Sequence, residues 1–238
     1  MKQLSILFFL CTTLALQAQQ LQLHYDFRHS IDPELHRRNF SYLSFEYFNA
    51  NDSLGSFLLK AQMDFNGEKN NIGQLFLQVS QNLRFWKPKV FMALNFTGGL
   101  GVTPPSYGYY LSNSFGLGAA YPFQWKGAWM NASMGYRYNT FAKPSHDLQG
   151  TLYFGKGFFN YKLLVAGSFV AYSENRNHGN EWTKDLRGKK LAFFGDPQIW
   201  YRIKGKYSIG SRYSMFYHVL TSEHTLQVYP SLALKREF

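Results

Sequence analysis

The sequence predicts an all-β protein, a transmembrane antiparallel β-barrel of about twelve strands with short periplasmic turns and longer extracellular loops. Three observations predict this fold. Segments with apolar residues at every second position recur along the chain, aromatic residues make up 19% of it, and the last alternating segment ends at Phe238. A two-residue period indicates strands with one apolar face. A barrel in a bilayer needs no long apolar run, because only every second residue of each strand faces lipid.

Residues 1–18 have the pattern of a secretory signal peptide, and residues 19–238 are expected to form a single outer-membrane β-barrel domain. Lys2 supplies the charged start, and the apolar run from Leu4 to Leu16 is too short to cross a membrane as a helix. We expect cleavage after Ala18. Cys11 lies within the apolar run and is the only cysteine, so the mature chain has no disulfide or cysteine metal site.

Alternation predicts the first six strands at residues 21–28, 40–48, 57–65, 73–85, 90–97 and 109–121. In the first, Leu21, Leu23 and Tyr25 alternate with polar residues, and the next four repeat the pattern. The sixth has small residues on one face, from Ser112 to Ala120. Polar segments rich in Gly, Asn or Pro predict connections at 29–39, 49–55, 66–72, 86–89 and 98–108.

The last six strands are predicted at residues 128–139, 147–154, 159–172, 190–203, 207–217 and 225–238. Their connections are expected at 122–126, 140–146, 155–158, 173–189, 204–206 and 218–224. The strand 190–203 contains Gly195-Asp196-Pro197, which predicts a bulge or bend. The last strand alternates most regularly, and its length suits a tilted membrane strand of about 9–11 residues.

The strand number and the loop lengths favour a barrel over a soluble sandwich. Bacterial single-chain barrels have an even number of strands, long extracellular loops and short periplasmic turns. The predicted connections after odd strands are longer than those after even strands, so both termini are expected on the periplasmic side. Aromatic residues gather at predicted strand ends, as in the two aromatic girdles of membrane barrels.

The formal charge of +11, reduced to +10 when Lys2 leaves with the leader, indicates contact with anionic groups. The basic residues are spread along the chain and form no single patch, so we expect no nucleic-acid partner. Basic groups at the barrel rims would pair with phosphates of outer-membrane lipids. Basic groups inside would bias the pore towards anionic or polar solutes.

The inward faces of the strands supply the candidate site. A barrel of twelve strands lies between filled eight-stranded barrels and water-filled ones of 16–18 strands, so its lumen depends on the side chains that project inward. Charged, amide and aromatic side chains at these positions could stack on a base and hydrogen-bond a ribose. The candidate pore-lining and substrate residues are Asp26, Arg28, Glu46, Lys60, Phe76, Gln78, Trp129, Asn131, Arg137, Arg212 and Tyr229.

Several segments resemble the nucleoside-specific outer-membrane channel family, Tsx-like, in this order: Tyr42–Phe48, Phe57–Phe65, Leu75–Ser80, Leu117-Gly118 and Met130–Tyr138. The resemblance spans about residues 21–238 and implies a monomeric twelve-stranded barrel with a narrow pore for nucleosides. It places the protein in the cell outer membrane of a Gram-negative bacterium. The chain is shorter than such channels, which indicates a compact branch, and the family's ligand residues do not transfer one by one.

The alternating last strand, ended by Phe238, resembles the C-terminal signal by which the barrel assembly machinery recognises its substrates. That machinery is therefore an expected partner, together with outer-membrane lipids and a small polar solute such as a nucleoside. The expected function is a passive channel for nucleosides or similar small polar solutes. A structural or adhesive barrel with a plugged lumen is the main alternative.

An outer-membrane lipid hydrolase is a further alternative, and it needs a serine activated by a histidine. Ser145-His146-Asp147 and Ser222-Glu223-His224 contain the residue types, but adjacent residues point to opposite faces of a strand. None of the seven histidines has a serine two positions later. We therefore expect no enzyme. The scattered histidines predict no metal site, and nothing indicates a cofactor.

Overall fold

A computed structural model describes residues 19–51, 55–103, 107–220 and 224–238. The predicted signal peptide at residues 1–18 lies outside these residues, so it remains a prediction. In the described part of the chain, no helix has the length and apolar character needed to cross a membrane.

The described chain is almost entirely strand. The strands are β1 (Gln19–Asp26), β2 (Phe40–Asn51), β3 (Gly55–Asp64), β4 (Gln74–Leu83), β5 (Phe91–Thr103), β6 (Tyr107–Trp125), β7 (Ala128–Asn139), β8 (Ser145–Phe158), β9 (Leu163–Asn175), β10 (Lys189–Gly195), β11 (Gln198–Lys204), β12 (Tyr207–Tyr217) and β13 (Gln227–Glu237). A one-turn helix, α2 (Arg28–Ile31), follows β1, and a 3-10 turn, η1 (Glu68–Asn70), precedes β4.

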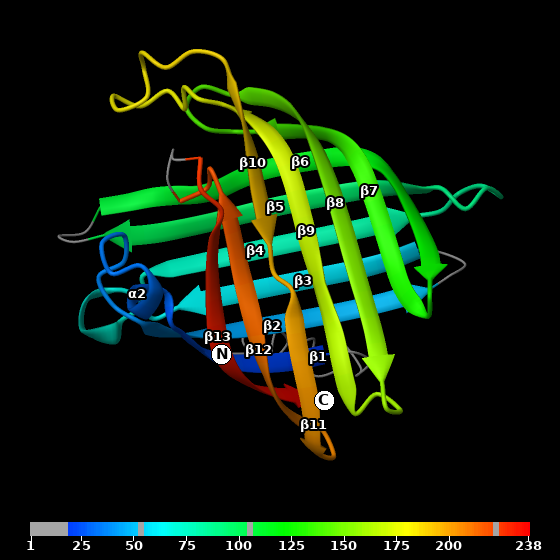
Figure 1. Cartoon of the computed structure of the whole chain (residues 1–238). Coiled ribbons are helices and arrows are strands. Elements are labelled where there is room, and N and C mark those ends of the chain that lie inside the picture. Colours follow the sequence, from blue (N-terminus) through cyan, green and yellow to red (C-terminus); the bar gives the residue numbers. More distant parts are fainter. Residues whose placement is uncertain (1–18, 52–54, 104–106, 221–223) are drawn as a thin grey trace, which may run out of the picture.

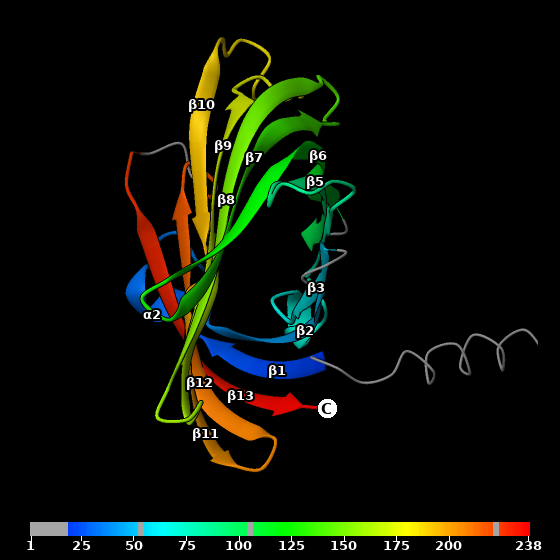
Figure 2. The same ribbon diagram turned by 90° about the vertical axis from the view of Figure 1, so that its right-hand side faces the viewer.

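The strands close into an antiparallel barrel of twelve staves, as the sequence predicts. Except for β10 and β11, each strand pairs with its neighbours in the chain, and β1 pairs with β13 to close the sheet. Strands β10 and β11 together form one stave, since both pair with β9 on one side and β12 on the other. They are separated at Asp196 and Pro197, which confirms the predicted bend. Figures 1 and 2 show the sheet curving round from β5 through β8 to β12 and β1.

The two faces of the barrel follow the alternation of the sequence. On β13, Tyr229, Ser231 and Lys235 are buried inside, whereas Leu232 and Leu234 are more than half exposed outside. The same alternation places apolar side chains on the outer surface of the other staves, for example Leu23, Leu75, Leu94, Leu117, Met134, Leu148, Leu191 and Ile209. The buried set is mostly polar. The protein is therefore apolar outside and polar inside, the reverse of a soluble barrel.

Several predicted boundaries are wrong. Residues 98–103 belong to β5 and residues 107–108 to β6, so most of the predicted loop 98–108 is paired β-strand. Residues 104–106 lie outside the described chain. Residues 155–158 extend β8, and the turn falls at 159–162, where three residues adopt positive φ. Main-chain pairing with neighbouring strands extended these segments despite their glycines.

Other boundaries moved by a few residues. Strand β6 continues through Pro122 to Trp125, and the turn is only Lys126-Gly127. The connection between β4 and β5 spans 84–90 and is longer than expected. The first strand ends at Asp26, because Arg28–Ile31 turn into α2.

Connections of different length lie at the two ends of the barrel. Segments 27–39, 65–73, 176–188 and 218–226 lie at one end, which we call the loop end; residues 221–223 of the last are not described. The connections 126–127, 159–162 and 205–206 lie at the other, the turn end. Figure 1 shows the loop end at the upper left and the turn end at the right and bottom. Residues Gln19 and Phe238 meet at the turn end, where the Phe238 N–H donates to the Gln19 carbonyl over 3.0 Å.

Candidate pore and vestibule

A cavity of about 940 Å³ opens inside the barrel towards the loop end. Loop segments 35–38, 66–69 and 219–220 contribute to its rim, and inward residues of most staves form its wall. We call this cavity the vestibule. Its lining mixes cationic side chains, amides, hydroxyls and aromatic rings. A volume of this size is within the usual range for small-molecule sites, about 300–1,000 Å³.

The structure places all eleven predicted site residues on inward-facing positions or at the foot of segment 27–39, but only five of them line the vestibule. Those five are Arg28, Phe76, Gln78, Arg137 and Arg212. Asp26 and Tyr229 lie behind Arg28, and Glu46 and Lys60 lie deeper in the barrel. Trp129 and Asn131 lie on β7 nearer the turn end. The predicted residues thus form several groups.

The first group docks the segment 27–39 onto the inner wall. Arg28 donates two hydrogen bonds to the Asp26 carboxylate, over 3.0 and 2.8 Å, and its guanidinium lies 4.7 Å from the Phe40 ring. The Tyr229 hydroxyl donates to Asp32 over 3.1 Å. The His36 ring packs edge-on against Tyr229 at 4.9 Å. Burial, and then the positive charge of Arg28, lower the pKa of His36, so this ring is docked in its neutral form.

The second group crosses the lumen. The Lys60 ammonium on β3 donates to Asp196 over 2.8 Å, and Arg212 on β12 donates to the same carboxylate oxygen over 3.3 Å. Arg212 also donates to Gln62 over 2.9 Å, and Glu46 lies 3.6 Å from Lys60. The main-chain break between β10 and β11 directs Asp196 inward, where the Ser168 N–H donates to its second oxygen over 2.8 Å.

A second contact between distant staves lies beside the first. The Gln78 amide on β4 donates to the Tyr153 hydroxyl on β8 over 2.7 Å, and Ser80 lies 3.2 Å from the same hydroxyl. We call the set Lys60, Gln62, Gln78, Tyr153, Asp196 and Arg212 the cross-barrel brace. The brace forms the floor of the vestibule, because Gln62, Gln78 and Arg212 belong to both.

Arg137 stands apart from the brace. It lies on β7, is only 5% exposed, and its guanidinium lies 4.1 Å from the centre of the Tyr172 ring on β9. Its nearest carboxylate, Glu174, is 3.9 Å away, which is beyond hydrogen-bonding distance. The buried Nη1 atom has no hydrogen-bond partner among the described residues.

The remaining predicted residues lie towards the turn end. Trp129 stacks on Phe48 of β2, with ring centres 6.1 Å apart. Strands β2 and β7 are not neighbours in the sheet, so this pair also spans the lumen. Asn131, one inward position along, has a buried side-chain oxygen without a partner in the described chain.

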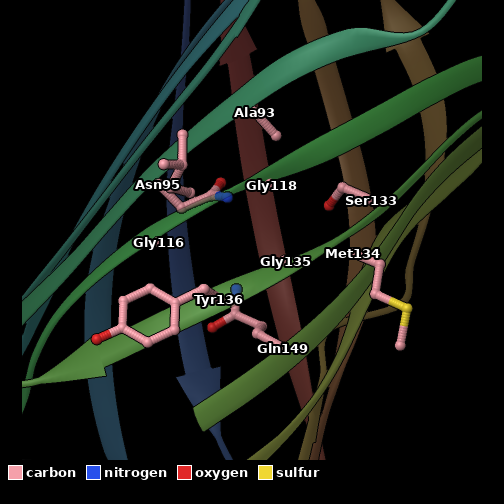
Figure 3. Close-up of a pocket in the computed structure, with 10 residues that line it drawn as sticks. Ala93, Asn95, Gly116, Gly118, Ser133, Met134, Gly135, Tyr136 and Gln149 are labelled. Carbon is pink, nitrogen blue, oxygen red and sulfur yellow. The ribbon is translucent and has the colours of Figure 1, made fainter. Parts of the chain in front are cut away.

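The wall formed by β5, β6 and β7 carries small inward side chains. Ala93, Asn95, Gly116, Gly118, Ser133 and Gly135 lie together there, and Figure 3 shows them with Gln149 of β8. Larger residues occupy the opposite wall, where Tyr42, His24 and Trp200 pack against one another. The lumen is therefore filled unevenly, with the bulk on the side of β1, β2 and β11.

Sequence reasoning missed Tyr172, Glu174 and Asp196 as site residues. Tyr172 falls on an inward position, so alternation could have found it. Asp196 was noted only as part of a bend, and its inward direction follows from the three-dimensional break. Partners across the lumen depend on how the staves are staggered around the barrel, which the sequence pattern does not show.

A serine and a histidine also meet across strands, where the sequence search found no such pair. His24 Nδ1 lies 2.9 Å from Ser231 Oγ, and Gln22 Oε1 lies 2.9 Å from His24 Nε2. The Ser231 hydroxyl also lies within hydrogen-bonding distance of the Arg212 carbonyl, at 3.2 Å, to which it donates. The described residues include no group of three side chains suited to a metal ion.

Solved structures similar to this chain are outer-membrane barrels. The NanC porin aligns over 93% of this chain and 100% of its own, with 10% identity and a TM-score of 0.52. OccK5 (OpdH) of Pseudomonas aeruginosa aligns over 90% of this chain and 61% of its own, with 9% identity and a TM-score of 0.39. Omp33 of Acinetobacter baumannii aligns over 92% of this chain and 97% of its own, with 11% identity and a TM-score of 0.36. The NanC match supports a porin-like barrel fold.

No curated protein sequence matches the chain. One family model matches residues 18–238, which is nearly the whole sequence. The chain therefore belongs to the family described as "Domain of unknown function (DUF5020)", and its fold is that of a porin.

Proposed function

We propose that this protein is an outer-membrane channel of a Gram-negative bacterium through which nucleosides or similar small polar solutes pass passively, without a cofactor. The observation that carries the proposal is the vestibule. It is an open cavity of about 940 Å³ inside a closed barrel, and polar and aromatic side chains line it together. Phe76 offers a ring, and Gln78 and Gln149 offer amides, to a solute that has both a flat face and hydroxyl groups.

The outer surface supports the membrane setting. Large apolar residues such as Leu117, Met134, Leu148 and Leu191 are each more than half exposed on the outside of the barrel. A soluble monomer rarely exposes apolar surface all round its circumference, whereas a barrel in a bilayer requires it. We accordingly expect the loop end to be extracellular and the turn end periplasmic.

The cross-barrel brace favours a second candidate, a structural or adhesive barrel with a plugged lumen. Lys60 and Asp196 bond from staves that are not neighbours, and their side chains are only 12% and 2% exposed. In a channel the brace is the constriction that sorts solutes, and in a structural barrel it is the plug. The two candidates therefore differ in whether solute passes the floor of the vestibule.

Uptake by liposomes decides between them. Liposomes carrying the refolded residues 19–238 are compared with empty ones for entry of a nucleoside, a hexose and an amino acid of similar size. Saturable, faster nucleoside entry supports the proposal, and equal entry of all three reduces it to a general narrow porin. If no solute enters, the protein is a structural or adhesive barrel with a plugged lumen and not a channel.

The assembly pathway is part of the same proposal. Strand β13 closes the barrel against β1, and Phe238 follows it directly. We propose that β13 and Phe238 are recognised by the barrel assembly machinery after residues 1–18 have been removed. Deletion of Phe238 should lower the amount of heat-modifiable, membrane-inserted protein in cells, whereas substitution of an exposed aromatic residue at the loop end, Trp182→Ala, should not. Normal insertion of the deletion variant would contradict it.

A further inference from the structure

We propose that Arg137 is the residue that binds the anionic group of the solute, and that the preferred solutes carry one carboxylate or phosphate beside a flat or apolar face. This inference rests on the proposed channel function and deepens it. It starts from the arginines of the vestibule, which differ sharply in how well their charges are already paired.

Three buried arginines line the described vestibule wall: Arg28, Arg137 and Arg212. Arg28 is held by two hydrogen bonds from its guanidinium to Asp26. Arg212 donates to Asp196 and Gln62 as part of the brace. Arg137 donates no hydrogen bond to any described side chain, since Glu174 lies 3.9 Å away and Nη1 has no partner. A buried guanidinium without acceptors is costly, and an anionic ligand would remove that cost.

Competition for Glu174 explains why Arg137 makes only a long ion pair, without a hydrogen bond. The same carboxylate lies 3.1 Å from the Lys190 ammonium and 3.8 Å from the ring of His178. Of these cationic neighbours, Lys190 lies closest to Glu174 and therefore interacts with it most strongly. Glu174 therefore faces two permanent cations. The other carboxylate of this wall, Asp147, lies opposite Arg137 on β8 and is paired with Lys189, so it leaves Arg137 without a second partner.

Tyr172 holds the free guanidinium in a useful orientation. The ring centre of Tyr172 lies 4.1 Å from the Arg137 Cζ atom, so the ring supports the guanidinium through a cation–π contact. Such a contact uses a face of the guanidinium and leaves its N–H edges for a ligand. A planar fork of N–H donors matches a carboxylate or a phosphate with two parallel hydrogen bonds.

The surroundings of Arg137 suggest the rest of the solute. Arg137 stands two positions from Gly135 on β7, on the wall where small residues leave room. Tyr172, Phe194 and Phe76 line the same vestibule and present apolar rings. A solute held by Arg137 through its anionic group can therefore rest a flat or apolar face on these rings before it reaches the brace.

The test uses pairs of solutes that differ only by an anionic group. Glucose is compared with glucuronate, and uridine with uridine monophosphate, in liposomes that carry the refolded chain. The wild type should admit the anionic member of each pair faster. The variant Arg137→Gln should lower the ratio of anionic to neutral entry by about tenfold or more, because the charge-assisted hydrogen bonds of the guanidinium are lost. The carboxylate and phosphate arms show which anion is preferred.

Two further variants sharpen the result. Arg137→Lys keeps the charge without the fork and should lie between wild type and Arg137→Gln. Lys184→Gln removes one charge from the exposed loop 176–188, outside the vestibule, and should leave the ratio within about twofold. An unchanged ratio in Arg137→Gln would overturn the inference and leave the channel standing.

Exclusion of all four solutes by the wild type would instead overturn the proposed channel. Calorimetric binding of the same probes to the detergent-solubilised barrel then decides the anion site separately. Tighter binding of the charged members, lost in Arg137→Gln, supports the site. Equal affinities of the charged and neutral members would contradict an anion site at Arg137.

Discussion

At the scale of single residues, Asp196 is a side chain that bonds to several strands inside the barrel. It accepts hydrogen bonds from Lys60, Arg212 and the backbone and hydroxyl of Ser168, so one carboxylate joins three staves. The alternation of the sequence predicted correctly that Lys60 and Arg212 face inward. It could not predict that Asp196 is their partner. Asp196 lies more than 130 positions after Lys60, at a strand break whose direction is defined only by the fold.

Replacement of Asp196 by asparagine should destabilise the barrel by about 3 kcal/mol, because it leaves two buried cations without their shared carboxylate. Urea unfolding of the refolded chain in lipid vesicles, followed by tryptophan fluorescence, measures the change. Glu181→Gln is the matched control, since the Lys184–Glu181 pair is exposed and should contribute less than about 1 kcal/mol. Equal stability of the two variants would show that the brace does not hold the barrel together.

His36 makes the docking of segment 27–39 depend on pH. Burial and Arg28 lower its pKa, while Asp32, Asp26 and His29 also face it. Below the ordinary value of 6.5, the undocked ring takes up a proton that the docked ring resists. Docking should therefore be unaffected by pH above 6.5 and weaken as the pH falls below it.

Hydrogen exchange of the backbone amides in 27–39 at pH 7.5 and pH 5.5, corrected for intrinsic rates, checks this expectation. Exchange should be faster at the lower pH in the wild type, and a variant His36→Phe should lose most of the difference because its ring cannot be protonated. Protection that is the same at both pH values would mean that His36 does not control docking.

At the scale of elements, the stave made of β10 and β11 is the irregular one. The facing residues of β9 run from Phe169, opposite Gly195, to Ala166, opposite Gln198, so Gly167 lies beside the break. Its position leaves no space for a side chain: a Cβ atom there would lie 2.6 Å from Pro197 Cα. The sequence signal Gly-Asp-Pro could predict that a break exists, but the matching glycine on β9 depends on strand register.

Gly167→Ala should destabilise the barrel by about 1–3 kcal/mol, because backbone atoms of Pro197 and Asp196 must move. Gly150→Ala on β8 provides the control, since the nearest atom to its Cβ would be 4.0 Å away. The difference between the two unfolding midpoints in urea is the quantity to measure. If both alanine variants unfold at the same urea concentration, the close approach of β9 to the break does not contribute to the stability of the barrel.

At the scale of the whole molecule, the closed antiparallel barrel follows from patterns that are local in the sequence. Alternation, turn residues and an even strand number predict the number of staves and which face of each is apolar. The ends of β5, β6 and β8 were missed because cross-strand pairing extends through glycines that read as turns. The uneven filling of the lumen was also missed, because it depends on which inward residues of distant staves come to one level.

The proposed function requires that solute pass through this barrel. The most direct test is uptake by liposomes containing the refolded chain, with the nucleoside uridine compared with glucose and with empty liposomes. We predict that uridine entry saturates with concentration and becomes faster in Lys60→Gln, which removes the hydrogen bond from β3 to Asp196. If wild type and variant exclude both solutes as completely as the empty liposomes do, the vestibule is a closed pocket and the protein is not a channel.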